Sequence, residues 1–98
     1  MLVYYVYIIT NKYNSVFYIG LTNNIERRII EHNFKVTNGF SAKYNLHKLV
    51  YLDEYSSRLD AIYREKQLKN WHRSWKLNLI RESNPMFNNL WDPETSSG

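Results

Sequence analysis

The run VYYVYII at residues 3–9 constrains the fold most, because it is apolar on both of its alternating faces. In an extended chain, successive side chains point to opposite faces, and here β-branched or aromatic residues occupy both. Such a strand is stable only when both faces are covered. The run therefore predicts a strand with a packed layer on each side of its sheet.

A second apolar run, VFYIGL at residues 16–21, follows after the polar segment TNKYNS at 10–15. The segment contains two asparagines, which favour turns. Because the connection is short, the two runs are expected to pair as an antiparallel hairpin.

A loop centred between residues 12 and 13 would place Tyr7 opposite Tyr18 and Tyr5 opposite Gly20. Residues that face each other across a strand pair share one face of the sheet, so the first two rings would lie side by side. Gly20 would then leave an open space beside them, where a ligand or a backbone could approach closely.

The segment TNNIERRIIEHNFK at residues 22–35 predicts a helix, with Asn23 or Asn24 as its N-cap. Ile25 and Ile29 form the stripe that faces the core.

The two arginines of this helix differ in direction. At ~100° per residue, Arg28 and His32 fall at the edge of the apolar stripe, one turn apart. Arg27 and Glu31 fall on the far side, where they can pair in solvent. Arg28 is therefore the arginine expected to point toward the sheet.

The remainder of the chain predicts one more strand and two more helices. Ser57 is placed to cap the second helix, and Pro85 is placed to end the third. The expected elements are a strand at 47–55, a helix at 56–71 and a helix at 74–83.

The chain of 98 residues has room for one core, so one domain is expected at 1–87, with a C-terminal tail at 88–98. A net charge of +4 favours polyanionic partners. The absence of cysteine excludes disulfides, thiolate metal sites and cysteine nucleophiles. No secretory leader or membrane-spanning run is evident, which predicts a cytoplasmic protein with no membrane partner.

Glu65 is the residue that least fits its expected surroundings. On a helical wheel it shares one face with Ala61, Leu68 and His72, while Arg64 and its neighbour at 66 are expected to point away. A carboxylate on an inward face is costly unless it is paired, protonated or bound to a metal ion.

Five side chains are expected to converge from one sheet face and two helices: Tyr7, Tyr18, Arg28, His32 and Glu65. Such a group suits phosphodiester hydrolysis. An arginine would neutralise a phosphate oxygen, and a lone carboxylate would hold Mg²⁺ or another divalent cation such as Mn²⁺. A phenol would take the proton from the attacking water, with help from a nearby cation, a phenol or an imidazole. Taken singly, each tyrosine would more often be a packing residue.

These residues also carry a resemblance to a known family. YVY at 5–7, YIG at 18–20, and Arg28 with His32 one turn later resemble the GIY-YIG nucleases, as does Glu65 within AIYREKQLK. The resemblance runs from about residue 3 to about residue 85. It is closest to small stand-alone bacterial members, which resemble the N-terminal nuclease domain of the excision-repair nuclease, a DNA-repair protein.

The resemblance implies a three-stranded antiparallel sheet flanked by helices, an α+β fold, and metal-dependent endonuclease cleavage of DNA. It gives Tyr7 the role of general base and Tyr18 that of a supporting phenol. Arg28 maps to the phosphate-binding arginine, His32 to a hydrogen-bonding or proton-relay partner, and Glu65 to the metal ligand.

The chain departs from the family pattern at three places. Tyr5 replaces the first signature's glycine, and Leu21 stands where the excision-repair branch has lysine. The family's late asparagine has two candidates, Asn84 and Asn78, of which Asn84 is favoured as a site-forming residue.

The segment LKNWHRSWK at 68–76 interleaves basic residues with Trp71 and Trp75. The cations can hold phosphates while the rings stack on bases. Equally, the tryptophans can pack two helices together while the charges face water. The candidate nucleic-acid-binding residues are Lys69, Arg73 and Lys76.

The substrate stays open among duplex, branched, damaged and single-stranded DNA, and RNA. A small nuclease domain has little surface for reading bases, so DNA shape or a protein partner is expected to supply specificity. The alternatives to an enzyme are a nucleic-acid-binding domain with a dormant site and an interaction module that uses its aromatic surface.

Overall fold

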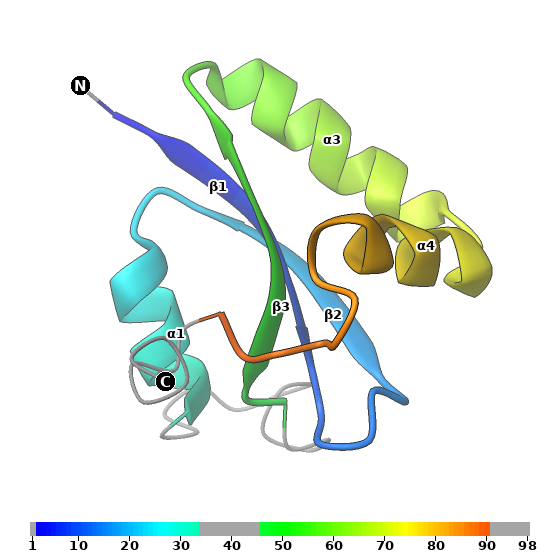
Figure 1. Cartoon of the computed structure of the whole chain (residues 1–98). Helices are drawn as coiled ribbons and strands as arrows, with labels where there is room; N and C mark the ends of the chain where they lie inside the picture. The colour runs from blue at the N-terminus through cyan, green and yellow to red at the C-terminus, as the bar shows by residue number, and fades with distance from the viewer. Residues whose placement is uncertain (1, 34–45, 91–98) are drawn as a thin grey trace.

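The computed structural model describes residues 2–33 and 46–90, with the backbone alone at 30–33. Three antiparallel strands form one sheet in the order β2-β1-β3 (Figure 1). The α+β prediction is confirmed, and the expected elements are found with ends shifted by at most three residues. The strands are β1 (Tyr4–Thr10), β2 (Phe17–Thr22) and β3 (Lys48–Tyr55), and the helices are α1 (Ile25–Asn33), α3 (Arg58–Asn70) and α4 (Arg73–Ser83).

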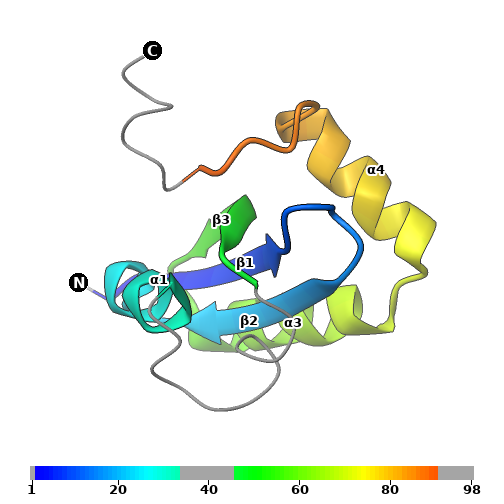
Figure 2. The same cartoon turned by 90° about the horizontal axis from the view of Figure 1, so that it is seen from below.

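The central strand β1 is covered on both faces, as its two-sided apolar pattern predicts. On one face, Val6 and Ile8 pack with residues of α3 and α4; on the other, Tyr7 and Ile9 pack with Ile29 of α1. Figures 1 and 2 show α1 and α3 on opposite sides of the sheet.

The hairpin register differs from the expected one by two residues. Tyr7 pairs with Gly20, and Tyr18 pairs with Ile9. The loop explains the shift, because it is centred one residue later than expected. The Asn11 side chain accepts a hydrogen bond from the Ser15 backbone N–H at 2.9 Å, and Asn14 adopts a positive φ of 55°.

The caps of the first two helices follow the sequence. The Arg27 backbone N–H donates to Asn24 Oδ1 at 3.1 Å, which decides between the two N-cap candidates of α1. The Asp60 backbone N–H donates to Ser57 Oγ at 3.4 Å at the start of α3.

The end of α4 is tied to β3 through Asn84, which is buried. Its amide nitrogen donates to the carbonyls of Val50 at 3.2 Å and Asn88 at 2.9 Å. The following residues continue along β3, since Leu90 N–H donates to the Leu49 carbonyl at 2.8 Å. The first residues after 87 therefore dock on the sheet, and the boundary there stays a prediction. None of the helices in the described part of the chain is long and apolar enough to cross a membrane.

Candidate active site

The two signature tyrosines lie together on the α1 side of the sheet. Their ring centroids are 6.4 Å apart, with the planes tilted by 42°. Tyr7 is 1% exposed, whereas Tyr18 is only partly buried. The pair therefore presents Tyr18 to the surface and keeps Tyr7 beneath it.

Gly20 does not leave an open space beside the rings, contrary to expectation. A Cβ at this position would lie 2.3 Å from Cζ and from the hydroxyl oxygen of Tyr7. The ring of Tyr7 thus fills the space directly over the glycine. The glycine of YIG is explained by close packing with the buried phenol rather than by ligand access.

Arg28 and Arg27 differ as the helical wheel predicts: Arg28 is partly buried and Arg27 is exposed. Arg28 lines a cleft of about 240 Å³ at the end of β2, where Leu21 and Arg58 are also found. His32 belongs to α1, but its side chain lies outside the described residues.

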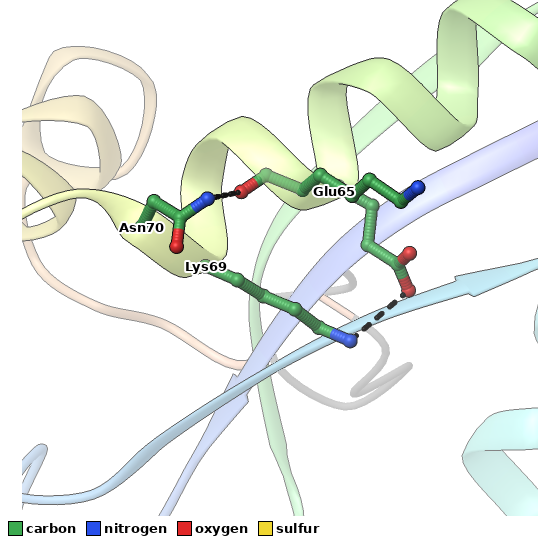
Figure 3. A network of polar contacts seen from close by, with 4 residues as sticks. Glu65, Lys69 and Asn70 are labelled. Atoms are coloured by element: carbon green, nitrogen blue, oxygen red, sulfur yellow. Dashed lines mark hydrogen bonds and ion pairs between the residues drawn. The ribbon is translucent and has the colours of Figure 1, made fainter.

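Glu65 lies on α3 with its side chain 19% exposed, and its Oε2 is 3.5 Å from Lys69 Nζ. Figure 3 shows both side chains leaving α3 on the side of the neighbouring strands, with the ion pair between their ends. The expected inward carboxylate is therefore partly buried and paired with a lysine one turn away.

The candidate residues whose side chains are described do not converge on one face of the sheet. Tyr7 and Tyr18 belong to the α1 face, while Glu65 comes from α3, whose Ala61 and Leu68 pack on the opposite face. The tyrosines share one sheet face as expected. Their convergence with the helix residues stays a prediction, because the helical wheel gives a residue's direction on its own helix and not the face of the sheet that the helix covers.

The outer edge of β2 is where the two faces meet. Tyr18 shares a cleft of about 260 Å³ with Phe17 and Ile19 of β2 and with Lys69 and Lys76. Lys69 in turn pairs with Glu65. A common site would therefore run around this edge, with phenols on one side and the carboxylate on the other.

The donor set at Glu65 fits one kind of metal ion. Among the described residues, no three His, Asp, Glu or Cys side chains gather at a point where they could share an ion. A single carboxylate suits Mg²⁺, which keeps several waters and takes further oxygens from substrate phosphates. Lys69 would have to release the carboxylate for an ion to bind there.

The three basic candidates for nucleic-acid binding are in different situations. Lys69 and Lys76 line the cleft beside Tyr18. Arg73 instead donates to the backbone carbonyls of Ser15 at 2.8 Å and Asn14 at 3.1 Å. Its guanidinium therefore fastens the start of α4 to the β1–β2 loop.

The two tryptophans contact each other edge to face, with centroids 5.9 Å apart. Trp71 packs against the core, and Arg64 lies over its ring at 5.1 Å. Arg64 thus does not point away from the protein as expected, because the indole offers its guanidinium a face. Trp75 is 52% exposed. Packing explains Trp71, and base stacking stays a prediction for Trp75.

The two candidates for the family's late asparagine lie in different surroundings. Asn84 is a buried cap whose amide nitrogen bonds backbone carbonyls. Asn78 is exposed and lines a groove on α4 with Trp71 and Trp75. Both lie on the side of the sheet away from the tyrosine pair, so neither has a shown place beside the phenols.

Arg58 was missed from the sequence. It opens α3 and lines the same cleft as Arg28. Its position seven residues before Glu65 was the available signal, since residues seven apart share a helix face. An arginine at the start of a helix usually faces solvent, so this spacing alone does not single Arg58 out.

Comparison with known proteins assigns this architecture to a family. A family model described as the GIY-YIG catalytic domain matches residues 3–78. A UPF0213 protein of Staphylococcus haemolyticus is 41% identical over 83 residues, which cover 81% of this chain and 95% of the relative. A UPF0213 protein of Clostridium perfringens is 42% identical over 80 residues, which cover 78% of this chain and 81% of the relative.

A solved structure shares the fold. The solution NMR structure of a UPF0213 protein from Bacillus halodurans matches with a TM-score of 0.58 and 26% identity, covering 92% of this chain and 95% of that one. The names of these relatives state no activity. The family match spans both tyrosine strands, α1 and α3. This chain therefore belongs to the GIY-YIG family.

Proposed function

We propose that this protein is a metal-dependent endonuclease that hydrolyses phosphodiester bonds in DNA at the outer edge of β2. The observation that carries the proposal is the match to a catalytic domain that includes all five candidate catalytic residues. Its support from geometry is the cleft that joins Tyr18 to Lys69, the partner of Glu65.

The phenol pair is proposed to activate the attacking water. The family resemblance gives the base role to Tyr7, but that side chain is 1% exposed. Tyr18 is the more accessible ring, so we assign it the contact with water and give Tyr7 the supporting role. A phenolate forming there needs nearby positive charge, which Lys69 and Lys76 can supply from the same cleft.

Arg28 is proposed to bind a non-bridging phosphate oxygen, because a guanidinium donates two parallel hydrogen bonds to such a group. Arg28 is partly buried on α1 and lines the cleft at the end of β2. His32 is proposed to relay a proton or to hydrogen-bond within the site.

Glu65 would hold a divalent cation, Mg²⁺ or Mn²⁺, that would stabilise negative charge on the phosphate when bound. The chain's own contribution is to fix the carboxylate on α3 and to keep Lys69 within 3.5 Å of it. Lys69 would then be released toward the substrate backbone.

DNA is the proposed substrate, with RNA open and with a protein partner or DNA shape as the source of specificity. The cytoplasmic location also stays a prediction. A non-catalytic nucleic-acid-binding domain is the second candidate, because Glu65 is already neutralised by a lysine.

The test compares wild type with Glu65→Gln in Mg²⁺ on duplex, branched and single-stranded DNA and on RNA. Both cleavage and affinity are measured. We expect the variant to keep its affinity and to lose cleavage by at least a hundredfold, which corresponds to about 3 kcal/mol. Glu82→Gln on α4, an exposed glutamate, is the matched control and should cleave like wild type.

Cleavage by wild type and Glu82→Gln, but not by Glu65→Gln, would support the enzyme. Salt-sensitive binding without cleavage of any substrate by wild type would overturn it in favour of the binding domain.

A further inference from the structure

Two arginines from different elements line one cleft at the end of β2. Arg28 comes from α1, and Arg58 is the first residue of α3. The cleft is about 240 Å³, and the rest of its wall is Tyr4, Leu21, Thr22 and Asn23. Figure 1 shows α1 and α3 on opposite sides of the sheet. The cleft at the end of β2 is nevertheless lined by one arginine from each helix.

The wall of this cleft is held in place by local hydrogen bonds. The Asn24 backbone N–H donates to Thr22 Oγ1 at 3.0 Å, and that hydroxyl donates to the Asn24 carbonyl at 3.3 Å. The turn from β2 into α1 is thereby fixed, and Arg28 lies on the first turn after it. One side of the cleft is therefore preorganised for a ligand, while Arg58 is exposed and able to adjust.

The charge of the cleft selects its ligand. Among the described residues that line it, none is a carboxylate. Two arginines that line one cleft can both donate hydrogen bonds to a single bound anion, and the guanidinium geometry matches a phosphate. The other polar residues of the lining, Tyr4, Thr22 and Asn23, are neutral.

We propose that Arg58 is a second phosphate-binding residue, and that Arg28 and Arg58 hold one phosphodiester group of the nucleic-acid strand between them. Arg58 reaches this cleft from α3 and Arg28 from α1, so the end of β2 receives cations from two helices.

This inference rests on the proposed function and extends its substrate contacts along β2. Arg58 and Lys69 are eleven residues apart on α3, which is about 16 Å along the helix axis. The Lys69 cleft lies beside Phe17–Ile19, at the opposite end of β2 from the Arg58 cleft. A strand following this edge would pass Glu65 between its two basic contacts.

The first experiment measures DNA affinity as a function of salt for wild type, Arg58→Gln and Arg81→Gln. Arg81 is an exposed arginine of α4 that lies over Phe87 at 6.0 Å, so its variant loses the same charge outside the cleft. We expect Arg58→Gln to bind severalfold more weakly and to lower the slope of log K against log salt by about 0.9, the value for one duplex phosphate contact. Arg81→Gln should keep the wild-type slope.

The second experiment follows the side-chain Nε–H signals of Arg28 and Arg58 by NMR. The probes are inorganic phosphate, a short DNA strand and the same strand with uncharged methylphosphonate linkages. We expect the DNA strand to shift both signals at concentrations where the methylphosphonate strand shifts neither. A response to inorganic phosphate with none to DNA would overturn the nucleic-acid assignment.

Equal slopes for the Arg58 and Arg81 variants would also overturn the inference. Neither experiment reads cleavage, so the two proposals can fail separately. A wild type that cuts nothing but binds DNA through Arg58 would end the nuclease proposal and leave this one intact.

Discussion

The two faces of the sheet differ in the size of their cores. The α3 and α4 face, here called the aliphatic face, has the larger core, which also includes the buried ring of Tyr51. Its fully buried aliphatic members are Val6, Ile8, Val50, Ala61, Leu68 and Ile80. The α1 face has a smaller cluster that includes the ring of Tyr7, with Tyr18 packed at its margin. Phenols occur on both faces but in different settings. On the first face, the hydroxyls of Tyr51 and Tyr55 donate to Asp53. On the second, Tyr7 and Tyr18 form a ring pair beside the edge strand β2.

The proposed site lies at the border between these faces. The tyrosines face α1, Glu65 comes from α3, and β2 is the edge strand between them. Substitutions on the aliphatic face should therefore change stability without changing the chemistry of the folded protein, and substitutions at the border should do the reverse.

The largest effect on stability is expected from Leu68→Ala, which removes a fully buried side chain from the aliphatic face. The free energy of unfolding should fall by about 2–5 kcal/mol, from lost burial and the cavity left behind. Leu59→Ala on the same helix is the control, since Leu59 is 77% exposed and its loss should cost about 0.5 kcal/mol or less. Urea denaturation measures both, and equal costs would contradict the assignment of faces.

A smaller loss, about 1–3 kcal/mol, is expected from Gly20→Ala on the tyrosine face, because the new methyl would overlap the Tyr7 ring. A double-mutant cycle with Tyr7→Leu sharpens the test. In the Tyr7→Leu background, the Tyr7 ring is absent, so Gly20→Ala should lower the free energy of unfolding much less. Additive costs in the double variant would show that the glycine is needed for another reason.

Arg73→Ala should lower the free energy of unfolding by about 1 kcal/mol, since it removes the two hydrogen bonds to the loop carbonyls. Arg81→Ala is the matched loss of charge on α4. If Arg73 serves packing alone, the two variants should bind DNA equally well. A larger loss of DNA affinity for Arg73→Ala than for Arg81→Ala would show that Arg73 also contacts nucleic acid.

A pH effect is expected on the α3 side of β3. Burial, and then the hydrogen bond that Tyr55 donates to Asp53 at 2.8 Å, raise the pKa of Tyr55 to about 12 from 10.0. The folded state therefore holds this proton more tightly than the unfolded state. The raised pKa therefore contributes to the free energy of unfolding in full below pH 10, and this contribution is lost as the pH rises toward 12.

Urea midpoints measured across that pH range should fall less steeply for Tyr55→Phe than for wild type. Asp53→Asn should give an intermediate slope, because it weakens the hydrogen bond from Tyr55 and leaves the burial of the phenol unchanged. Identical slopes for all three proteins would refute the assignment.

The sequence predicted the elements well because each has a strong local signal. The two-sided apolar run predicted a strand covered on both faces, the N-caps predicted the starts of two helices, and the difference between Arg27 and Arg28 followed from helix geometry. These features depend on residues close together in the chain, which pattern analysis reads directly.

The features that could not be predicted depend on distant contacts. The register shifted because the loop that the Asn11 side chain organises is centred one residue later, and the space over Gly20 was filled by a ring from the neighbouring strand. The position of Glu65 across the sheet from Tyr7, and the meeting of Arg28 with Arg58, required knowing which face each helix covers.

The most direct test of a site shared around the edge of β2 uses Mn²⁺ as a paramagnetic probe. It is titrated into ¹⁵N-labelled wild type and Glu65→Gln in the presence of a short DNA strand, and the loss of amide signals is mapped. The account predicts that signals around Glu65 on α3 and around Tyr18 on β2 broaden together in wild type and that both are spared in the variant. Broadening on α3 that leaves Tyr18 and Ile19 sharp, or broadening unchanged in the variant, would contradict it.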